Sequence, residues 1–557
     1  MFKQELQERV AEILGVRAEK ISLAHTEDFS HGDYSTNIAF VLAKEKGENP
    51  KELAASFVAK LAEAKLPNVS KVEVAGAGFI NFYLTREFFA KNIAEILKEK
   101  EDFGNNKSLE GKKVMIEYTD PNPFKEFHIG HLMTNTIGES IAQLFVANGA
   151  ETKKVCYQSD VGLHVAEAVW AIKKSNILNP TIKDLGNAYT EGNKAYRENN
   201  EAKKEIEEIN KALYSHEDSE LNKLYETGRS LSLQYFETIY EKLGTKFDHY
   251  FFEGETAIFG KKMVEEGLDK GVFEKGEEGA IIYNGEKHGL HTRVFINKFG
   301  IPIYEAKDLG LTKLKYDTFP YDSSISVTAN EITEYFKVVK SALSQLEPEL
   351  AEKLRHIPHG VMKLPSGKMS SRTGDVITAL SLIDEVKAKV LEKMKGREIG
   401  NMDMVAEQIA IGAIKYSILK QSPGKDIIFD FDKSISFEGD SGPYLQYSAV
   451  RANSVLEKAK GEGIKSEVKN IPKELSEVER LLPRFPEIVE RAVLEFAPQY
   501  VATYLIELAG AFNTFYANTK VLDGSDSAPY RLAITEAVKT VLTNGLHILA
   551  IKVPEKM

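Results

Sequence analysis

Apolar positions recur with a helical period at the start of the chain and again throughout its last third. Near the N-terminus, four of them share one helix face: Phe2, Leu6, Val10 and Ile13. The stretch Val72 to Leu84 is rich in strand-forming residues and has a Gly turn near its middle, which predicts paired strands. Residues 1–107 are therefore expected to form a small α+β domain that ends in a polar, glycine-containing stretch.

The middle of the chain alternates between strand and helix patterns. Residues 108–400 begin with the apolar run Val114 to Ile116 and continue in strand–helix units, so we expect an α/β domain with a Rossmann-like parallel sheet and crossover helices. A highly charged helical segment at about 180–243 interrupts the alternation. We interpret its charges as the solvated face of a helical insertion between the two halves of the sheet.

Strand signals fade after residue 400. Five segments with helical spacing follow: Met404 to Leu419, Gly442 to Gly461, Ser476 to Leu494, Tyr500 to Asn518 and Pro529 to Leu549. Residues 401–557 are therefore predicted to be an all-helical domain.

Composition narrows the class of protein. The formal net charge is −11, which does not indicate a nucleic-acid binder but leaves room for a local basic groove. The one cysteine, Cys156, allows neither an internal disulfide nor a zinc site built from several cysteines, and its strand-like neighbours predict a buried core position. The sequence shows no signal peptide and no apolar run of about 20 residues, so we expect a soluble, cytoplasmic protein.

The segment His128-Ile129-Gly130-His131 carries the clearest chemistry. It follows an apolar strand and a short turn and opens a helical pattern that runs to Asn148-Gly149. A helix N-terminus has free N–H groups and a partial positive charge, so two imidazoles there suit a polyphosphate. Gly130 lets a ligand approach the backbone closely. The alternative is a surface turn capped by two histidines.

A second candidate segment lies far downstream, in residues 363–375. It combines three basic side chains with glycines and hydroxyls, which is the chemistry of a loop that closes over phosphates. Alone, this segment would more simply be a basic surface loop.

Together, the two segments resemble the HIGH and KMSKS signatures of class I aminoacyl-tRNA synthetases. Further stretches are similar to the arginyl-tRNA synthetases: Glu117 to Leu132, Pro302 to Gly310, Gly442 to Arg451, His31 to Phe40 and Gly76 to Phe82. The resemblance extends over essentially the whole chain in the family's order. It implies an enzyme that activates arginine with ATP, together with Mg²⁺, and esterifies the arginine to the 3′ end of its tRNA.

The resemblance also implies roles for individual residues. The expected ATP-binding residues are His128, Gly130, His131, Lys368, Met369, Ser370 and Ser371. The expected arginine-binding residues are Glu117, Asn122, His131, Tyr304, Asp308 and Glu331. A guanidinium is planar and always charged, so carboxylates are its natural partners. Without the resemblance, Asp308 would be interpreted as a helix-cap acid and Tyr304 as a core aromatic.

The chain departs from the family pattern at three places. Ser371 stands where the KMSKS pattern has its fourth-position lysine, so we assign Lys125 as the main compensating cation and Lys368 and Arg372 as secondary ones. Glu331 stands at the place of a family glutamine beside the substrate side chain. The segment 159–162 reads Ser-Asp-Val-Gly where the family often has Asp-Trp-Gly.

Transfer RNA is the macromolecular partner that the resemblance implies. The expected contacts are Phe79 and Asn81 for a D-loop base and, for the anticodon region, Tyr447, Arg451, Asn513 and Tyr516, with Phe512 beside them. We also expect that tRNA is required for arginine activation, that the protein is a monomer, and that it holds no structural metal.

Three other classes of protein compete with this interpretation. A class I synthetase for another amino acid would have no use for Asp308 with Tyr304, and a small-molecule nucleotidyltransferase would have no use for the two flanking domains. A catalytically dead RNA-binding relative would be expected to lose His128, His131 or the basic loop, and all three are present. A scaffold protein is disfavoured because the chain has no low-complexity or coiled-coil tract.

Overall fold

The structure is a computed structural model that describes residues 2–177, 179–215, 218–363, 377–396 and 400–557. The chain forms two compact units. One unit comprises Met1–Asn105, Tyr447–Val489 and Tyr504–Gly545, and the other comprises Asn106–Gln446, Glu490–Thr503 and Leu546–Met557. The domain boundaries expected at residues 107 and 400 stay a prediction.

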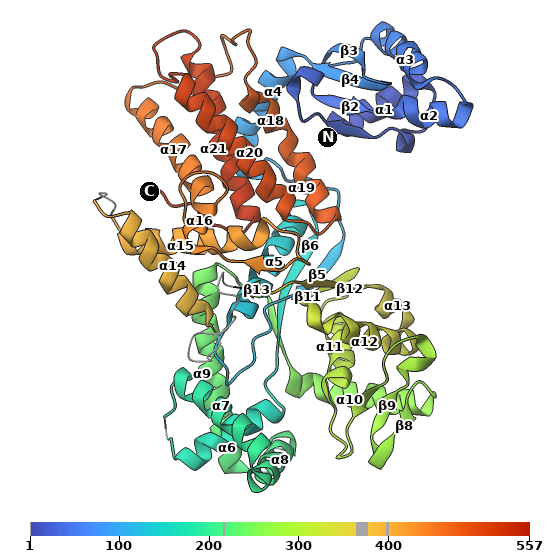
Figure 1. Ribbon diagram of the computed structural model, residues 1–557, viewed down its shortest axis with the longest axis vertical. Helices are drawn as coiled ribbons and strands as arrows, with labels where there is room; N and C mark the ends of the chain where they lie inside the picture. Colours follow the sequence, from blue (N-terminus) through green and yellow to red (C-terminus); the bar gives the residue numbers. More distant parts are fainter. Residues whose placement is uncertain (1, 178, 216–217, 364–376, 397–399) are drawn as a thin grey trace. The chain divides into compact units, whose positions relative to one another are not determined.

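The first unit begins with the small α+β domain (Figure 1). Its antiparallel sheet has the order β1-β2-β4-β3, with β1 at Leu23–His25, β2 at Tyr34–Thr36, β4 at Phe79–Leu84 and β3 at Val69–Ala75. Its helices are α1 (Phe2–Leu14), α2 (Ile38–Lys46), α3 (Pro50–Ala64) and α4 (Arg86–Glu99). The predicted N-terminal helix and the paired strands around a Gly turn are confirmed.

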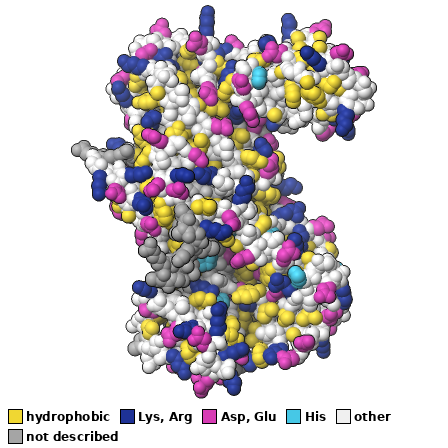
Figure 2. Space-filling model, in the orientation of Figure 1, with side chains coloured by type: hydrophobic (Ala, Val, Ile, Leu, Met, Phe, Trp, Pro, Cys, Tyr) yellow, Lys and Arg dark blue, Asp and Glu magenta, His cyan; other side chains and the backbone are white. Residues whose placement is uncertain are grey.

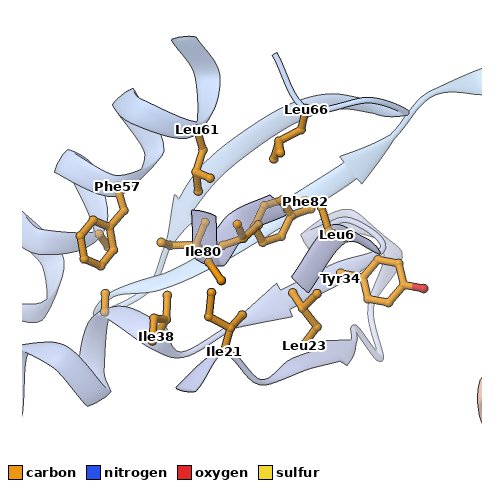
Figure 3. Close-up of a cluster of buried hydrophobic side chains, with 14 of the residues drawn as sticks. Leu6, Ile21, Leu23, Tyr34, Ile38, Phe57, Leu61, Leu66, Ile80 and Phe82 are labelled. Atoms are coloured by element: carbon orange, nitrogen blue, oxygen red, sulfur yellow. The ribbon is translucent and has the colours of Figure 1, made fainter. Parts of the chain in front are cut away.

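The core of this domain lies between the helices and one face of the sheet (Figure 3). Leu6 of α1 and Phe57 and Leu61 of α3 pack with Ile80 and Phe82 of β4. The start of α3 is fixed locally, because Asn49 accepts from Lys51 N at 2.9 Å and Pro50 occupies the first helical position.

The rest of the first unit is helical. It contains α18 (Glu477–Leu481), the 3₁₀ turn η7 (Leu482–Arg484) and parts of α17 (Gly442–Gly461), α19 (Phe485–Leu494), α20 (Gln499–Asn518) and α21 (Ala528–Ile548). The helical spacing expected from Ser476 to Leu494 is confirmed, but the helix tightens to the 3₁₀ turn η7, which contains Pro483, between α18 and α19. Arg480 donates to Asp33 at 2.5 Å, and Arg86 pairs with Glu479 at 2.7 Å, so ion pairs join the helices to the α+β domain.

The second unit is built on a five-stranded parallel sheet with the order β12-β11-β5-β6-β7. The strands are β5 (Lys113–Glu117), β6 (Glu151–Gln158), β7 (His249–Phe252), β11 (Ser323–Ala329) and β12 (Leu354–His359). Val114, Met115 and Ile116 are all buried, as expected for a parallel strand covered on both faces. Cys156 is buried in β6, and the predicted α/β class is confirmed.

Helices connect the strands of this sheet and follow its last strand, and α6 lies apart from the sheet (Figure 1). These helices are α5 (Ile129–Ala147), α6 (Leu163–Ser175), α10 (Glu253–Asp269), α11 (Tyr304–Thr318), α12 (Thr333–Leu346), α13 (Pro348–Glu352), α14 (Ala379–Lys393), α15 (Met402–Leu419) and α16 (Phe431–Ser434). The charged insertion is α7 (Ile182–Glu198), α8 (Asn200–Ser215) and α9 (Ser219–Leu243). As predicted, α8 buries only one face, through Ala202, Ile206, Ile209 and Leu213.

Two small sheets were not predicted. The antiparallel sheet β10-β9-β8 comprises Arg293–Ile296, Ile281–Tyr283 and Glu274–Lys275, and β13 (Met362–Lys363) pairs with β14 (Ile427–Ile428). In the part of the chain that the structure describes, no helix is long and apolar enough to span a membrane.

Candidate active site

Described residues that flank the basic segment contact the first turns of α5 and the residues before it. Thr378 forms an antiparallel bridge with His128, Ile129 N donates to Ile377 O at 3.2 Å, and Ala379 N donates to Phe127 O at 2.8 Å. Upstream of the basic segment, His359 Nε2 lies 2.8 Å from Thr134 Oγ1, one turn into α5. The described residues on both sides of the basic segment therefore contact α5. Lys368, Met369, Ser370, Ser371 and Arg372 lie outside the described residues.

The imidazoles of His128 and His131 are stacked at the start of α5. Their ring centroids are 3.6 Å apart, and His128 Nδ1 accepts from Gly130 N at 3.1 Å and from His131 N at 3.3 Å. His131 Nδ1 accepts in turn from His128 N at 3.3 Å. With both Nδ1 atoms accepting, the Nε2 atoms are assigned as the N–H donors.

Both imidazoles are neutral at pH 7. Burial, followed by the charge of Lys125, lowers the pKa of His128 to about 4. Burial, followed by His128, holds the pKa of His131 well below its usual value. Two neutral N–H donors at a helix N-terminus can hydrogen-bond an anion as its negative charge grows.

Gly130 makes room for one of these rings. A Cβ at residue 130 would lie 2.9 Å from Cε1 and Nδ1 of His128. From the sequence, Gly130 is expected to let a ligand approach the backbone closely. The structure adds a local reason, because a larger residue would displace the His128 imidazole.

Lys125 lies in the turn between β5 and α5. Its Nζ is 4.1 Å from the ring centroid of Tyr189 on α7, a cation–π contact. In the same turn, Thr119, Asp120 and Phe124 adopt positive φ angles, and Phe124 N donates to Ser232 Oγ of α9 at 2.9 Å. The insertion helices therefore hold a strained turn that carries a cation next to the paired imidazoles.

Several acidic side chains converge where β5, β6 and β7 end. Three of them have their own cation: Glu117 with Lys315 at 2.7 Å, Glu253 with Lys307 at 2.5 Å, and Glu305 with Arg293 at 3.0 Å. The carboxyl edge of a parallel sheet is where such folds bind ligands. None of the three cations was predicted: Lys307 and Lys315 are buried on α11 and Arg293 lies on β10, and each pairs with a carboxylate on another element.

Asp308 differs from these carboxylates. Its side chain forms no ion pair with any described Lys or Arg, and its one described contact is a hydrogen bond from Tyr335 OH to Oδ2 at 2.6 Å. Burial raises the pKa of Asp308 to about 8, and Glu117, Glu253 and Glu305 add to that shift, while Tyr335 opposes it. A carboxyl group held in this way favours a cationic ligand.

Three other residues were predicted to bind arginine, namely Tyr304, Asn122 and Glu331. Tyr304 begins α11 one turn before Asp308 and is 54% exposed, and Asn122 lies in the Lys125 turn. Glu331 is exposed in the short turn η6 (Asn330–Ile332), and Tyr335, farther along the chain, contacts Asp308.

Asp160, in the third departure from the family pattern, has a structural role. One carboxylate oxygen accepts from Arg229 Nε at 2.9 Å, and the other accepts from Gly254 N at 3.0 Å. Asp160 therefore ties the end of β6 to α9 and to the start of α10. In the described part of the chain, no group of three His, Cys, Asp or Glu side chains is arranged to hold a metal ion.

Three family models match the chain. The model described as tRNA synthetases class I (R), catalytic domain, matches residues 92–431, and the arginyl tRNA synthetase N terminal domain matches residues 1–84. The DALR anticodon binding domain matches residues 445–557. The chain belongs to the arginyl-tRNA synthetase family.

Similar proteins agree with this assignment. An arginine–tRNA ligase of Treponema denticola is 32% identical, over 93% of this chain and 92% of its own length. One from Clostridium perfringens is 31% identical, and the match covers all of both chains. The Thermus thermophilus arginyl-tRNA synthetase structure matches over the full length of both chains, with a TM-score of 0.81 and 25% identity. A Mycobacterium tuberculosis methionyl-tRNA synthetase, with a TM-score of 0.52 and 13% identity, shares the fold.

Four predicted tRNA-binding residues of this arginyl-tRNA synthetase form one cluster in the first unit. The guanidinium carbon of Arg451 is 4.7 Å from the Tyr447 ring centroid and 5.3 Å from that of Tyr516, and Arg451 donates to Asn513 at 2.5 Å. Tyr516 is 42% exposed, whereas Phe512 is fully buried and is a core residue. Aromatic and guanidinium planes of this kind suit the stacking of unpaired bases.

The other two predicted tRNA contacts of the synthetase lie on β4. Phe79 is 46% exposed and packs against Phe40 with a centroid distance of 5.0 Å, while Asn81 is buried. Acidic and basic side chains are interspersed over the face drawn in Figure 2, so the described residues of that face do not carry one sign of charge.

Proposed function

We propose that this synthetase activates L-arginine with ATP and transfers it to the 3′ end of tRNA(Arg). In the first step, the arginine carboxylate attacks the α-phosphorus of ATP, and pyrophosphate leaves with the electrons of the broken P–O bond. In the second step, the oxygen of a terminal ribose hydroxyl attacks the carbonyl carbon of arginyl-adenylate, the bond from that carbon to the phosphate oxygen breaks, AMP leaves with its electrons, and the hydroxyl proton passes to AMP or to water. Positioning and charge stabilisation supply most of the rate enhancement in such reactions.

The observation that carries this proposal is the difference in ion pairing between Asp308 and the three neighbouring glutamates. Glu117, Glu253 and Glu305 are neutralised by cations of the chain, while Asp308 has a tyrosine hydroxyl as its partner. A substrate guanidinium would supply the missing charge and form paired hydrogen bonds with the carboxylate.

The phosphates of ATP are assigned to the N-terminus of α5. The Nε2–H groups of His128 and His131, with Lys125 beside them, offer donors and positive charge, and Mg²⁺ is expected to enter with ATP. Lys368, Met369, Ser370, Ser371 and Arg372 are proposed to complete the phosphate site. The protein is proposed to act as a cytoplasmic monomer.

An aminoacylation assay tests the proposal directly. With purified tRNA(Arg) transcript and ATP, the enzyme is expected to charge arginine but not citrulline, which is nearly isosteric and carries no charge. Lysine is the control for a positively charged side chain that lacks the planar guanidinium and its paired N–H donors. Charging of citrulline at the rate of arginine, or no charging of arginine, would refute the proposed specificity.

The order of binding has its own prediction. ATP–pyrophosphate exchange with arginine is expected only when tRNA(Arg) is present, as the family resemblance implies. Exchange is measured with and without the transcript, and with a non-cognate tRNA as control. Equal rates in all three reactions would contradict tRNA-dependent activation.

The contribution of Lys125 is a separate prediction. Lys125→Ala is expected to slow exchange by about 10²-fold, and by more than Lys368→Ala, because Lys125 is the compensating cation assigned beside His128. The control is Lys183→Ala, on the exposed side of the same insertion. A larger loss for Lys368→Ala would reverse the assignment.

A further inference from the structure

Tyr335 is the described partner of Asp308, a carboxylate of the acidic centre that forms no ion pair with a described Lys or Arg. It lies on α12, after β11, and its hydroxyl donates to Asp308 Oδ2 at 2.6 Å. The guanidinium carbon of Arg293 lies 5.4 Å from the centroid of the Tyr335 ring, and Arg293 also pairs with Glu305. The ring is thus held on one side by a cation that is itself fixed.

The phenol remains a donor throughout the neutral range. Burial, followed by the charges of Asp308 and Glu305, keeps the pKa of Tyr335 well above its usual value. An ionised carboxylate has two oxygens and about four lone-pair positions, so one bond from Tyr335 leaves Oδ1 and the rest of Oδ2 open to a ligand. The hydrogen bond from Tyr335 therefore fixes the plane of the carboxylate and leaves most of its lone pairs free to accept hydrogen bonds from a ligand.

We propose that Tyr335 is a positioning residue for arginine recognition: its hydroxyl orients the Asp308 carboxylate toward the substrate guanidinium. This inference rests on the proposed function, in which Asp308 binds the side chain of arginine. Tyr335 does not touch the substrate in this scheme. It acts through Asp308, by fixing the geometry of the carboxylate and by favouring its ionised form.

The surroundings of Asp308 give this role a pH signature. From the neighbouring elements, Glu117, Glu253, Glu305, Asp120 and Tyr157 interact with Asp308 electrostatically. Three of the carboxylates are paired with cations: Glu117 with Lys315, Glu253 with Lys307 and Glu305 with Arg293. Asp120 accepts a bond from Tyr157 N at 2.7 Å.

Arginine binding needs the charged form of Asp308, so KM for arginine is expected to fall as pH rises through about 8. The Tyr335 hydrogen bond favours that charged form. Loss of this hydrogen bond therefore moves the pH at which KM for arginine falls to a higher value.

The test is Tyr335→Phe in the full-length enzyme, assayed by charging of tRNA(Arg) from pH 6.5 to 9.5. At pH 7.5, KM for arginine is expected to rise about tenfold, as for the loss of one hydrogen bond to a charged group. KM for ATP and kcat at saturating arginine are expected to change less than about twofold. The midpoint of the pH step in KM for arginine is expected to move upward.

Tyr283→Phe is the matched control. Its hydroxyl contacts Ser341 at 2.7 Å and Gln345 at 2.6 Å in the same hydrophobic cluster as α12, but it does not contact Asp308. This variant is expected to keep the arginine KM and the pH midpoint. A purely structural role for Tyr335 would raise both KM values together and leave the midpoint in place.

The outcomes separate two failures. A wild-type enzyme that charges arginine, with a Tyr335→Phe variant of unchanged arginine KM and unchanged pH midpoint, overturns the role of Tyr335. A wild-type enzyme that does not charge arginine overturns the proposed function instead. If Tyr335→Phe does not fold, 3-fluorotyrosine is incorporated at residue 335. Its more acidic hydroxyl is expected to lower the midpoint, and an unmoved midpoint overturns the proposal.

Discussion

Asp308→Asn is expected to lower kcat/KM for arginine by about 10³-fold, the largest loss among single changes in the acidic centre. The variant keeps the size of the side chain and removes the charge that a buried guanidinium needs. Breaking one side of a buried charged pair costs about 3–5 kcal/mol, which corresponds to a factor of about 10²–10⁴. The measurement is steady-state charging of tRNA(Arg) over a range of arginine concentrations.

Asp317→Asn is the matched control, because Asp317 lies on the same helix and pairs with Lys313 at an exposed site. It is expected to leave kcat/KM within about twofold. A loss of less than about tenfold for Asp308→Asn would mean that another carboxylate binds the guanidinium.

The same substitution is expected to change how stability depends on pH. The pKa of Asp308 is about 8 in the folded protein, above the ordinary value of 3.8, so the folded state binds an extra proton between these pH values. The stability of the arginine-free enzyme therefore falls as pH rises from about 4 to 8, and Asp308→Asn removes this contribution. The difference in Tm between Asp308→Asn and wild type is therefore expected to be more positive at pH 8 than at pH 5. An equal difference at both pH values would contradict the raised pKa of Asp308.

The second large effect is expected from the paired imidazoles. His128→Ala and His131→Ala should each slow arginine-dependent ATP–pyrophosphate exchange by about 10²–10³-fold, the usual result of losing one preorganised donor to the reacting phosphates. The two losses should not add, because the rings stack and each accepts a backbone hydrogen bond from the other's residue. Exchange in the presence of tRNA(Arg) measures the effect, and the double variant measures the coupling.

His249→Ala is the control for this pair. His249 is an exposed residue of β7 and lies outside the α5 N-terminus. It is expected to keep wild-type exchange. If the losses in exchange rate for His128→Ala and His131→Ala add fully in the double variant, the two histidines act independently. That result would contradict the coupling expected from the stacked pair.

Periodic patterns predicted the architecture well. The helical runs of the last third and the strand–helix alternation of the middle each depend on burial that repeats along the chain, and such repeats are visible in one sequence. The segment from Ser476 to Leu494 shows the limit of this reasoning. Its apolar positions keep a helical period across η7. That period does not reveal the 3₁₀ turn at Pro483, which separates α18 from α19.

The candidate site was predictable only in part. The two histidines are close together in the sequence, within consecutive strand, turn and helix patterns. Their place at a helix N-terminus could therefore be inferred from the sequence. The pair of Lys315 with Glu117 joins residues 198 positions apart, and Tyr335 meets Asp308 across two helices. Contacts of this kind depend on how helices pack, which no local pattern specifies.

The support that the insertion gives to the Lys125 turn has a practical consequence for protein engineering. Residues 182–243 resemble a removable surface module, because they are highly charged and α8 buries only one face. Yet this segment contacts the catalytic domain at two places. Tyr189 and Ser232 contact the Lys125 turn, and Arg229 binds Asp160 just after the end of β6. A truncated chain made for crystallisation or expression would therefore lose its catalytic competence together with its excess charge.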